Sequence, residues 1–150
     1  MTLRMTVAAS LAIALSACTT ADSGGGGGSA AGELAGTSWR LAELRSGELA
    51  ERPGDTSRYT MELAADGSAA LQLDCNRGTG RWQSTGPGQL TFSPIAMTRA
   101  LCPAGSFDTR IAVELGEVRG YSLTGDRLTL ERQGGGSIVW VRPTIQPTPR

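Results

Sequence analysis

Histidine and lysine are both absent from this chain of 150 residues. Without histidine, the chain lacks the commonest general base, the commonest metal ligand and the usual partner of a nucleophilic serine or cysteine. The 14 basic residues are all arginine, and 14 acidic residues balance them to a formal net charge of +0. Because the charges are also interspersed, without a basic stripe, the composition does not favour binding to nucleic acid.

The chain also has little apolar sequence of the length that a membrane span requires. The mostly apolar run from Val7 to Ala17 has 11 residues, whereas a helix needs about 20 residues to cross a bilayer. Arg4 precedes the run and small residues end it, which is the layout of a secretory signal peptide. The sequence therefore predicts an exported protein with residues 1–17 as its signal peptide.

The end of this segment has a more specific pattern. Leu15-Ser16-Ala17-Cys18 resembles the bacterial lipobox, in which a leucine and two small residues precede a cysteine. The resemblance implies cleavage before Cys18, a diacylglyceryl thioether on its sulfur, and acylation of the new amino group. Two or more acyl chains anchor a protein stably to a membrane. The alternative is an ordinary secreted protein with a chance cysteine.

The residue after the lipobox bears on localisation. It is Thr19 rather than aspartate, and in Gram-negative lipoproteins this implies sorting to the outer membrane, facing the periplasm. The membrane is thus the first expected partner, reached through the N-terminal acyl chains.

Three segments follow the signal peptide. Residues 18–33 hold the lipidated cysteine and five consecutive glycines, which predict a flexible tether with a mean span of about 20 Å. Residues 34–142 are predicted to form the folded domain. Residues 143–150 are rich in proline and predict an extended or disordered tail.

The folded part reads mainly as short strands separated by glycine, proline and aspartate turns. Tyr59, Met61 and Leu63 alternate with polar neighbours, and Asp66-Gly67 favours a hairpin turn before the next strand. The stretch 120–142 predicts a meander of three strands. We expect an α+β domain of about eight short, mainly antiparallel strands in a partly closed barrel or curved sheet.

One segment has a helical period instead. Its apolar residues recur at spacings of four, four and three, which is one stripe of an amphipathic helix. We predict Ser106 as its N-cap and Gly120 as its end. The helix is expected to pack on the sheet and cover its core rather than to bind a partner. The stripe consists of Phe107, Ile111, Leu115 and Val118.

The three cysteines depend on the compartment for their roles. If Cys18 carries lipid, Cys75 and Cys102 remain in an oxidising compartment, where such a pair is typical of a disulfide. The chain-entropy model gives a loop of this length about 3–4 kcal/mol of stabilisation. Free structural thiols are the main alternative.

Other roles for the cysteines meet obstacles. A metal site would need more ligands, and a catalytic cysteine would need a base, so we expect no metal and no cofactor. After Cys75, the residues Asn76, Gly78 and Gly80 are predicted to supply the backbone freedom of a tight turn.

Several motifs in combination resemble one known family. "LAGTSWRL", "DCNRGTGRW", "GQLTF", "AMTRALCP" and "GDRLTL" are similar to the META domain of HslJ-like bacterial lipoproteins, over Leu34 to about Val141. The resemblance implies a small α+β domain without catalytic residues, among envelope proteins linked to heat shock and antibiotic tolerance. Gly78 departs from an aromatic residue in many relatives, and Ala100 and Leu101 depart from methionines. The departures bear on any surface function for which the relatives use that aromatic residue and those methionines.

The motif residues themselves offer a hypothesis about recognition. Asn76, Arg77, Thr98 and Arg99 match the family motifs and come close together if the disulfide forms. They could make a polar recognition patch. The alternative is that they satisfy backbone groups of turns and pair with surface carboxylates.

Three classes of function remain to be weighed. The leading one is a monomeric, non-enzymatic envelope lipoprotein, a binding or structural module in envelope stress or antibiotic tolerance, with an envelope protein as a possible partner. The second is a binder of a small apolar ligand, or an inhibitor like the tethered lipoproteins that block lysozyme. An enzyme is the third, but no paired arrangement of carboxylates is visible. Five aromatic residues could either fill the core or line a pocket: Trp39, Trp82, Trp140, Tyr59 and Tyr121.

Overall fold

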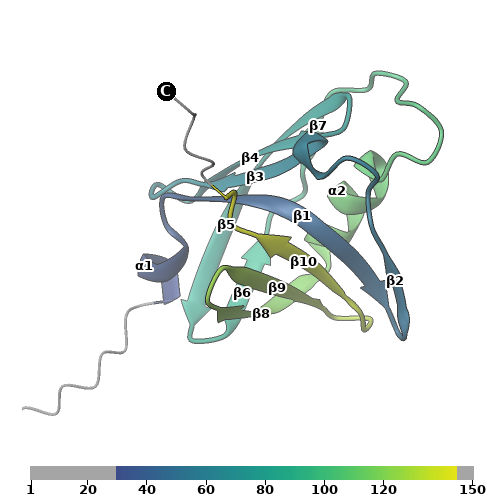
Figure 1. Cartoon of the computed structure of the whole chain (residues 1–150). Coiled ribbons are helices and arrows are strands. Elements are labelled where there is room, and N and C mark those ends of the chain that lie inside the picture. The colour runs from purple at the N-terminus through teal and green to yellow at the C-terminus, as the bar shows by residue number, and fades with distance from the viewer. Residues whose placement is uncertain (1–29, 145–150) are drawn as a thin grey trace, which may run out of the picture.

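The structure, a computed structural model, describes residues 30–144 as one antiparallel β-barrel with short helices (Figure 1). The helices are α1 (Ala30–Leu34), the 3-10 helix η1 (Thr56–Arg58) and α2 (Asp108–Gly116). The strands are β1 (Thr37–Ser46), β2 (Leu49–Glu51), β3 (Tyr59–Leu63), β4 (Ser68–Leu73), β5 (Asn76–Gly86), β6 (Gln89–Phe92), β7 (Ala96–Met97), β8 (Val118–Thr124), β9 (Arg127–Arg132) and β10 (Ser137–Val141).

The barrel is closed rather than partly closed. Its strands follow the order β10-β9-β8-β6-β5-β4-β3-β1, and β1 then pairs with β10 to complete the circle. Two short strands lie outside the ring, since β2 pairs with β1 and β7 pairs with β5. The predicted α+β class is confirmed, with an eight-stranded barrel plus two extra strands.

Closure follows from the length of the first strand. Strand β1 has ten residues, so its first half pairs with β3 and its second half pairs with β10. A register shift between Leu41 and Glu43 bends the strand, and such bulges are common where a sheet must curve. The last three strands form the meander predicted for residues 120–142.

Buried side chains fill the interior of the barrel. Trp39 and Trp140 are 0% exposed, and the other three aromatic residues considered above are buried with them. The aromatic side chains therefore pack the core and do not line an internal pocket. The core cluster comprises Leu34, Trp39, Leu41, Leu44, Tyr59, Met61, Leu63, Ala69, Leu71, Leu73, Trp82, Leu90, Phe92, Ile111, Leu115, Val118, Tyr121, Leu128, Leu130, Ile138 and Trp140.

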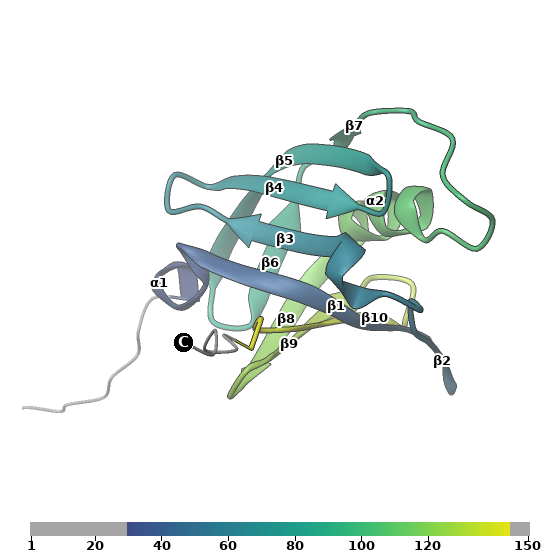
Figure 2. The ribbon, with the colours of Figure 1, turned by 45° about the horizontal axis from the view of Figure 1, so that its top comes forward.

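Helix α2 covers one end of the barrel, and α1 lies at the other end in both views (Figures 1 and 2). The predicted stripe is correct for Ile111 and Leu115, which are fully buried. The prediction for Val118 is wrong, because the helix ends at Gly116 and Val118 pairs with Arg132 in the sheet. The backbone of Val118 is paired with β9, so this residue belongs to a strand although its spacing in the sequence fits the apolar stripe of the helix.

The predicted ends of this helix also need correction. Phe107 occupies the N-cap position without a side-chain capping bond, while the Asp108 N–H donates to the Ser106 hydroxyl at 3.3 Å. Gly120 belongs to β8, where a Cβ would lie 3.2 Å from the Gly88 carbonyl oxygen. This glycine therefore allows β8 and the turn between β5 and β6 to approach closely, and it does not end a helix.

The two hairpin turns around β4 differ in their outcome. The Asp66-Gly67 turn is confirmed: Gly67 has φ +80°, and the Asp66 carboxylate accepts the Ser68 N–H at 2.8 Å. The prediction that Asn76, Gly78 and Gly80 make the next turn is wrong, because all three lie within β5. Asp74, at φ 57°, makes that turn instead.

The ends of the described chain frame the domain. Helix α1 extends it four residues before the predicted boundary at Leu34, and Ala31 packs against the core. The predicted signal peptide, Cys18, most of the tether and the tail from residue 145 lie outside the described residues. Within residues 30–144, no helix is long and apolar enough to span a membrane.

Candidate functional site

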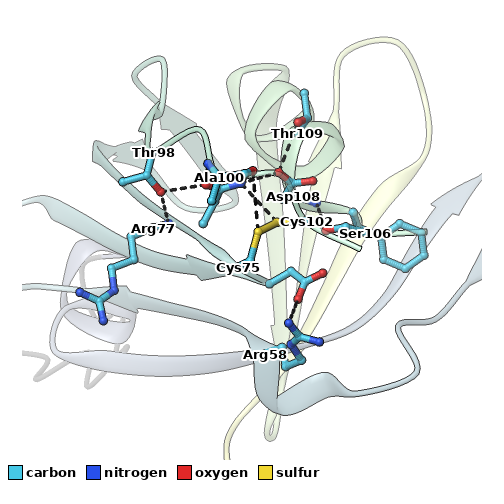
Figure 3. Close-up of a disulfide and its surroundings, with 12 residues drawn as sticks. Arg58, Cys75, Arg77, Thr98, Ala100, Cys102, Ser106, Asp108 and Thr109 are labelled. Atoms are coloured by element: carbon cyan, nitrogen blue, oxygen red, sulfur yellow. Dashed lines mark hydrogen bonds and ion pairs between the residues drawn. A yellow bond between two sulfur atoms is a disulfide. The ribbon is translucent and has the colours of Figure 1, made fainter. Parts of the chain in front are cut away.

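A disulfide between Cys75 and Cys102 joins the β4–β5 turn to the segment that precedes α2 (Figure 3). The Cα atoms of the two cysteines are 5.4 Å apart, and their sequence positions differ by 27. The predicted pairing is thus present in the structure. It fixes a long loop, residues 98–107, that otherwise makes no strand of its own.

Asn76 reinforces this link from inside the fold, since only 1% of its surface is exposed. Its amide nitrogen donates to the Ala100 carbonyl at 3.0 Å and to the Asp108 carboxylate at 2.8 Å. Its amide oxygen accepts the Ala100 N–H at 2.7 Å and the Thr98 hydroxyl at 2.9 Å. One buried side chain therefore holds β5, the loop and the start of α2 together.

The predicted recognition patch divides into two parts. Asn76 and Thr98 are occupied by structural contacts, because the Thr98 hydroxyl also accepts the Arg77 N–H at 2.9 Å. The guanidinium of Arg77 points away from this network (Figure 3). The side chains of Arg77 and Arg99 are both exposed. Within residues 30–144, no acidic side chain pairs with either of them.

The glycines of β5 accommodate Ile95. A Cβ at Gly78 would lie 2.8 Å from Ile95 Cγ2, and one at Gly80 would lie 2.6 Å from Ile95 Cδ1. Real Cβ atoms do not approach this closely, so the bare strand lets Ile95 pack directly on β5. This is a physical reason for glycine at position 78, which the sequence pattern had assigned to a turn.

A surface groove lies between α2 and the segment that carries β7, and we call it the α2 groove. Its volume is about 600 Å³. Leu101 and Val113 stand at its sides with 101% and 60% of their surfaces exposed. The lining residues are Asn76, Pro94, Ile95, Met97, Arg99, Ala100, Leu101, Asp108, Thr109, Ala112, Val113 and Gly116.

Two of the residues that line the α2 groove are charged, Asp108 negatively and Arg99 positively. Burial alone would raise the pKa of Asp108, but hydrogen bonds from the Thr109 N–H, Asn76 and Ser106 hold that pKa below its usual value. The ionised form of Asp108 is thereby stabilised within the fold. Arg99 is the one cationic side chain among the lining residues.

A scan of family models matches residues 32–144 of the chain to the META domain. The chain belongs to the META domain family. The match covers every strand described above, and it confirms the resemblance read from the sequence motifs. No curated protein matches the chain.

Solved structures share the fold of this META domain at low sequence identity. An NMR structure of a protein from Burkholderia xenovorans has 21% identity and a TM-score of 0.64, and the match covers 77% of this chain and 87% of that one. A crystal structure of a DUF4847 family protein from Bacteroides vulgatus has 15% identity and a TM-score of 0.53, with 75% and 96% covered. These likenesses establish the fold alone.

The acidic side chains of the META domain differ in their partners. Asp74 pairs with Arg58 at 2.5 Å, and Glu114 pairs with Arg110 at 2.8 Å. Asp66 belongs to its turn, and Glu62 lies exposed on β3. Among residues 30–144, no cluster of three or more metal-ligating side chains occurs.

Sequence reasoning missed two features of this META domain. The α2 groove has no local signal, because its walls come from segments that meet only in the fold. Glu43, 2% exposed, is surrounded by Arg45, Arg52 and Arg127 at 2.5–2.8 Å. Burial would raise the pKa of Glu43, but these arginines hold it below its usual value. Glu43 lies at the register shift of β1.

Proposed function

We propose that this protein is a non-enzymatic outer-membrane lipoprotein whose META domain binds another envelope component at the α2 groove. The observation that carries the proposal is the groove itself, with Leu101 and Val113 exposed beside it. Exposed apolar side chains that gather around one concave surface are typical of binding sites. The barrel interior is filled, so a binding role falls to this outer surface.

The support for a binding module also comes from the rigidity of the groove walls. The disulfide and the four hydrogen bonds of Asn76 to Ala100, Asp108 and Thr98 tie the loop wall to β5 and α2. A preformed site loses little conformational entropy when it binds.

The membrane part of the proposal is supported by sequence alone. The lipobox ending at Cys18 and the glycine-rich segment after it fit a domain held near a membrane on a flexible tether. We include a role in envelope stress or antibiotic tolerance because the family resemblance implies it.

A complementation experiment tests this function. A strain without the gene should become more sensitive to envelope stress or antibiotics, and the wild-type gene should restore resistance. We expect Cys18→Ser, which removes the anchor, and Val113→Asp, which charges the groove, to fail to restore it. Leu49→Asp is the matched control, since Leu49 is 73% exposed on β2 and outside the groove.

Protein levels must be compared so that poor expression is not read as lost binding. If Val113→Asp restored resistance as fully as Leu49→Asp, the groove would not be the functional surface. If the deletion itself changed nothing under these stresses, the proposed envelope role would be overturned.

A further inference from the structure

The two charged side chains of the α2 groove, Arg99 and Asp108, differ in their partners. The Asp108 carboxylate already accepts a hydrogen bond from the Asn76 amide nitrogen at 2.8 Å. Arg99 has no acidic partner within residues 30–144 and lines the groove with its side chain exposed. A ligand that brings one negative charge to Arg99 would form the missing pair.

Most of the other lining residues are apolar, with Asn76 and Thr109 as the exceptions. Ile95 and Met97 on one side face Ala112 and Val113 of α2, with Leu101 beside them. Such apolar side chains suit an unbranched alkyl chain, which gains about 0.8 kcal/mol for each methylene it buries.

The size of the groove favours a small molecule over a protein surface. Its volume of about 600 Å³ falls within the range of about 300–1,000 Å³ for small-ligand pockets. A stable protein partner commonly buries about 800 Å² on each side. We propose that the α2 groove binds a fatty acid, with its carboxylate at Arg99 and its alkyl chain between Ile95 and α2. The inference rests on the proposed function and names the ligand class of the same site.

Calorimetric titration with dodecanoate tests the inference. The protein is the full chain with Cys18→Ser, so that its own acyl chains do not compete, and dodecanoate stays below its micellar concentration. We expect one molecule to bind, and affinity to rise by up to about fourfold per methylene from octanoate to dodecanoate. Dodecyltrimethylammonium, with the same chain and opposite charge, should bind more weakly.

Variants locate the binding site. Arg99→Gln should weaken dodecanoate binding by about fivefold or more and remove the preference for dodecanoate over dodecyltrimethylammonium. Val113→Asp should weaken both ligands. Arg81→Gln is the charge-matched control, because Arg81 is exposed on β5 and does not line the groove. Circular dichroism of each variant separates lost binding from lost folding.

The outcomes distinguish the binding of a fatty acid from the more general binding function proposed for the α2 groove. Equal binding of the two amphiphiles, or binding unchanged by Arg99→Gln, would overturn the fatty-acid assignment. No binding of dodecanoate at millimolar concentration would also overturn it. The binding function would still stand in those cases if Val113→Asp failed to complement while Leu49→Asp succeeded, and a peptide or protein would then be the occupant to seek.

Discussion

At the scale of single residues, the motif Cys-Asn-Arg is mainly a structural device. Asn76 uses both ends of its amide, donating to Asp108 and accepting from Ala100 and Thr98. A buried amide left without these partners would cost about 1–3 kcal/mol. The identity of this residue therefore follows from the hydrogen bonds of the loop. Of the predicted patch, Asn76 and Arg99 line the groove, and Arg99 is the one of the two whose side chain is exposed.

Glycine at position 78 has a testable packing reason. We expect Gly78→Ala to destabilise the domain by about 1–3 kcal/mol, because the new methyl group would overlap Ile95 Cγ2. In an Ile95→Ala background the same substitution should cost much less. Urea unfolding of the four proteins gives the coupling energy.

Gly86→Ala provides the matched control for this cycle. It also lies in β5, but the nearest atom to its added Cβ is 4.0 Å away. Its cost should be small in both backgrounds. A coupling energy near zero between positions 78 and 95 would contradict the packing argument.

At the scale of elements, the first turn of α2 is the link between the disulfide loop and the barrel. Asp108 begins the helix and accepts the Asn76 amide at 2.8 Å. Carboxylates are favoured at helix N-termini, where backbone N–H groups are unpaired. The ionised form of Asp108 is therefore the form that the fold stabilises.

This arrangement predicts a pH dependence of stability. The pKa of Asp108 is lower in the folded protein than its usual 3.8. Its contribution is thus present above the unfolded pKa and is lost as the pH falls through the folded value. We expect Asp108→Asn to lose less stability than the wild type when the pH is lowered from about 5 to about 2.

Chemical unfolding across this pH range makes the comparison. Other aspartates also have lowered pKa values, including Asp66, so the informative quantity is the difference between the two curves. Parallel curves for wild type and Asp108→Asn would show that Asp108 does not couple protonation to folding.

At the scale of the whole molecule, the barrel is not equally strong around its circumference. Strands β6 and β8 share one registered pair, Gln89 with Gly120, supported by the hydrogen bond from the Tyr121 N–H to the Gly88 carbonyl at 2.9 Å. Strands β1 and β10 share five registered pairs. The β6–β8 boundary is therefore the place where the closed sheet should open first.

Hydrogen exchange can locate this weak boundary. We expect amides of β6 to be at least about tenfold less protected than those of β10, a difference of ~1.4 kcal/mol in opening free energy. The reason is that fewer inter-strand hydrogen bonds break when β6 separates from β8. Equal protection of the two strands would show that the barrel opens only as a unit.

The sequence by itself determined the features that depend on local pattern. Alternating apolar residues and the Asp66-Gly67 turn predicted antiparallel strands, and the stripe through Ile111 and Leu115 predicted the helix. The cysteine pair and the combined motifs predicted the disulfide and the family. Each of these signals lies within a few neighbouring residues or in a spacing along the chain.

Only the tertiary structure decided the features that depend on distant segments meeting. Closure of the barrel needed β1 to pair with β10. The helix ended at Gly116 because Val118 pairs with β9. The α2 groove is lined by Ile95, which packs on Gly78 and Gly80 of β5, and by Val113 of α2. No local pattern encodes such contacts, because burial and pairing energies are set by the partner segment as much as by the residue itself.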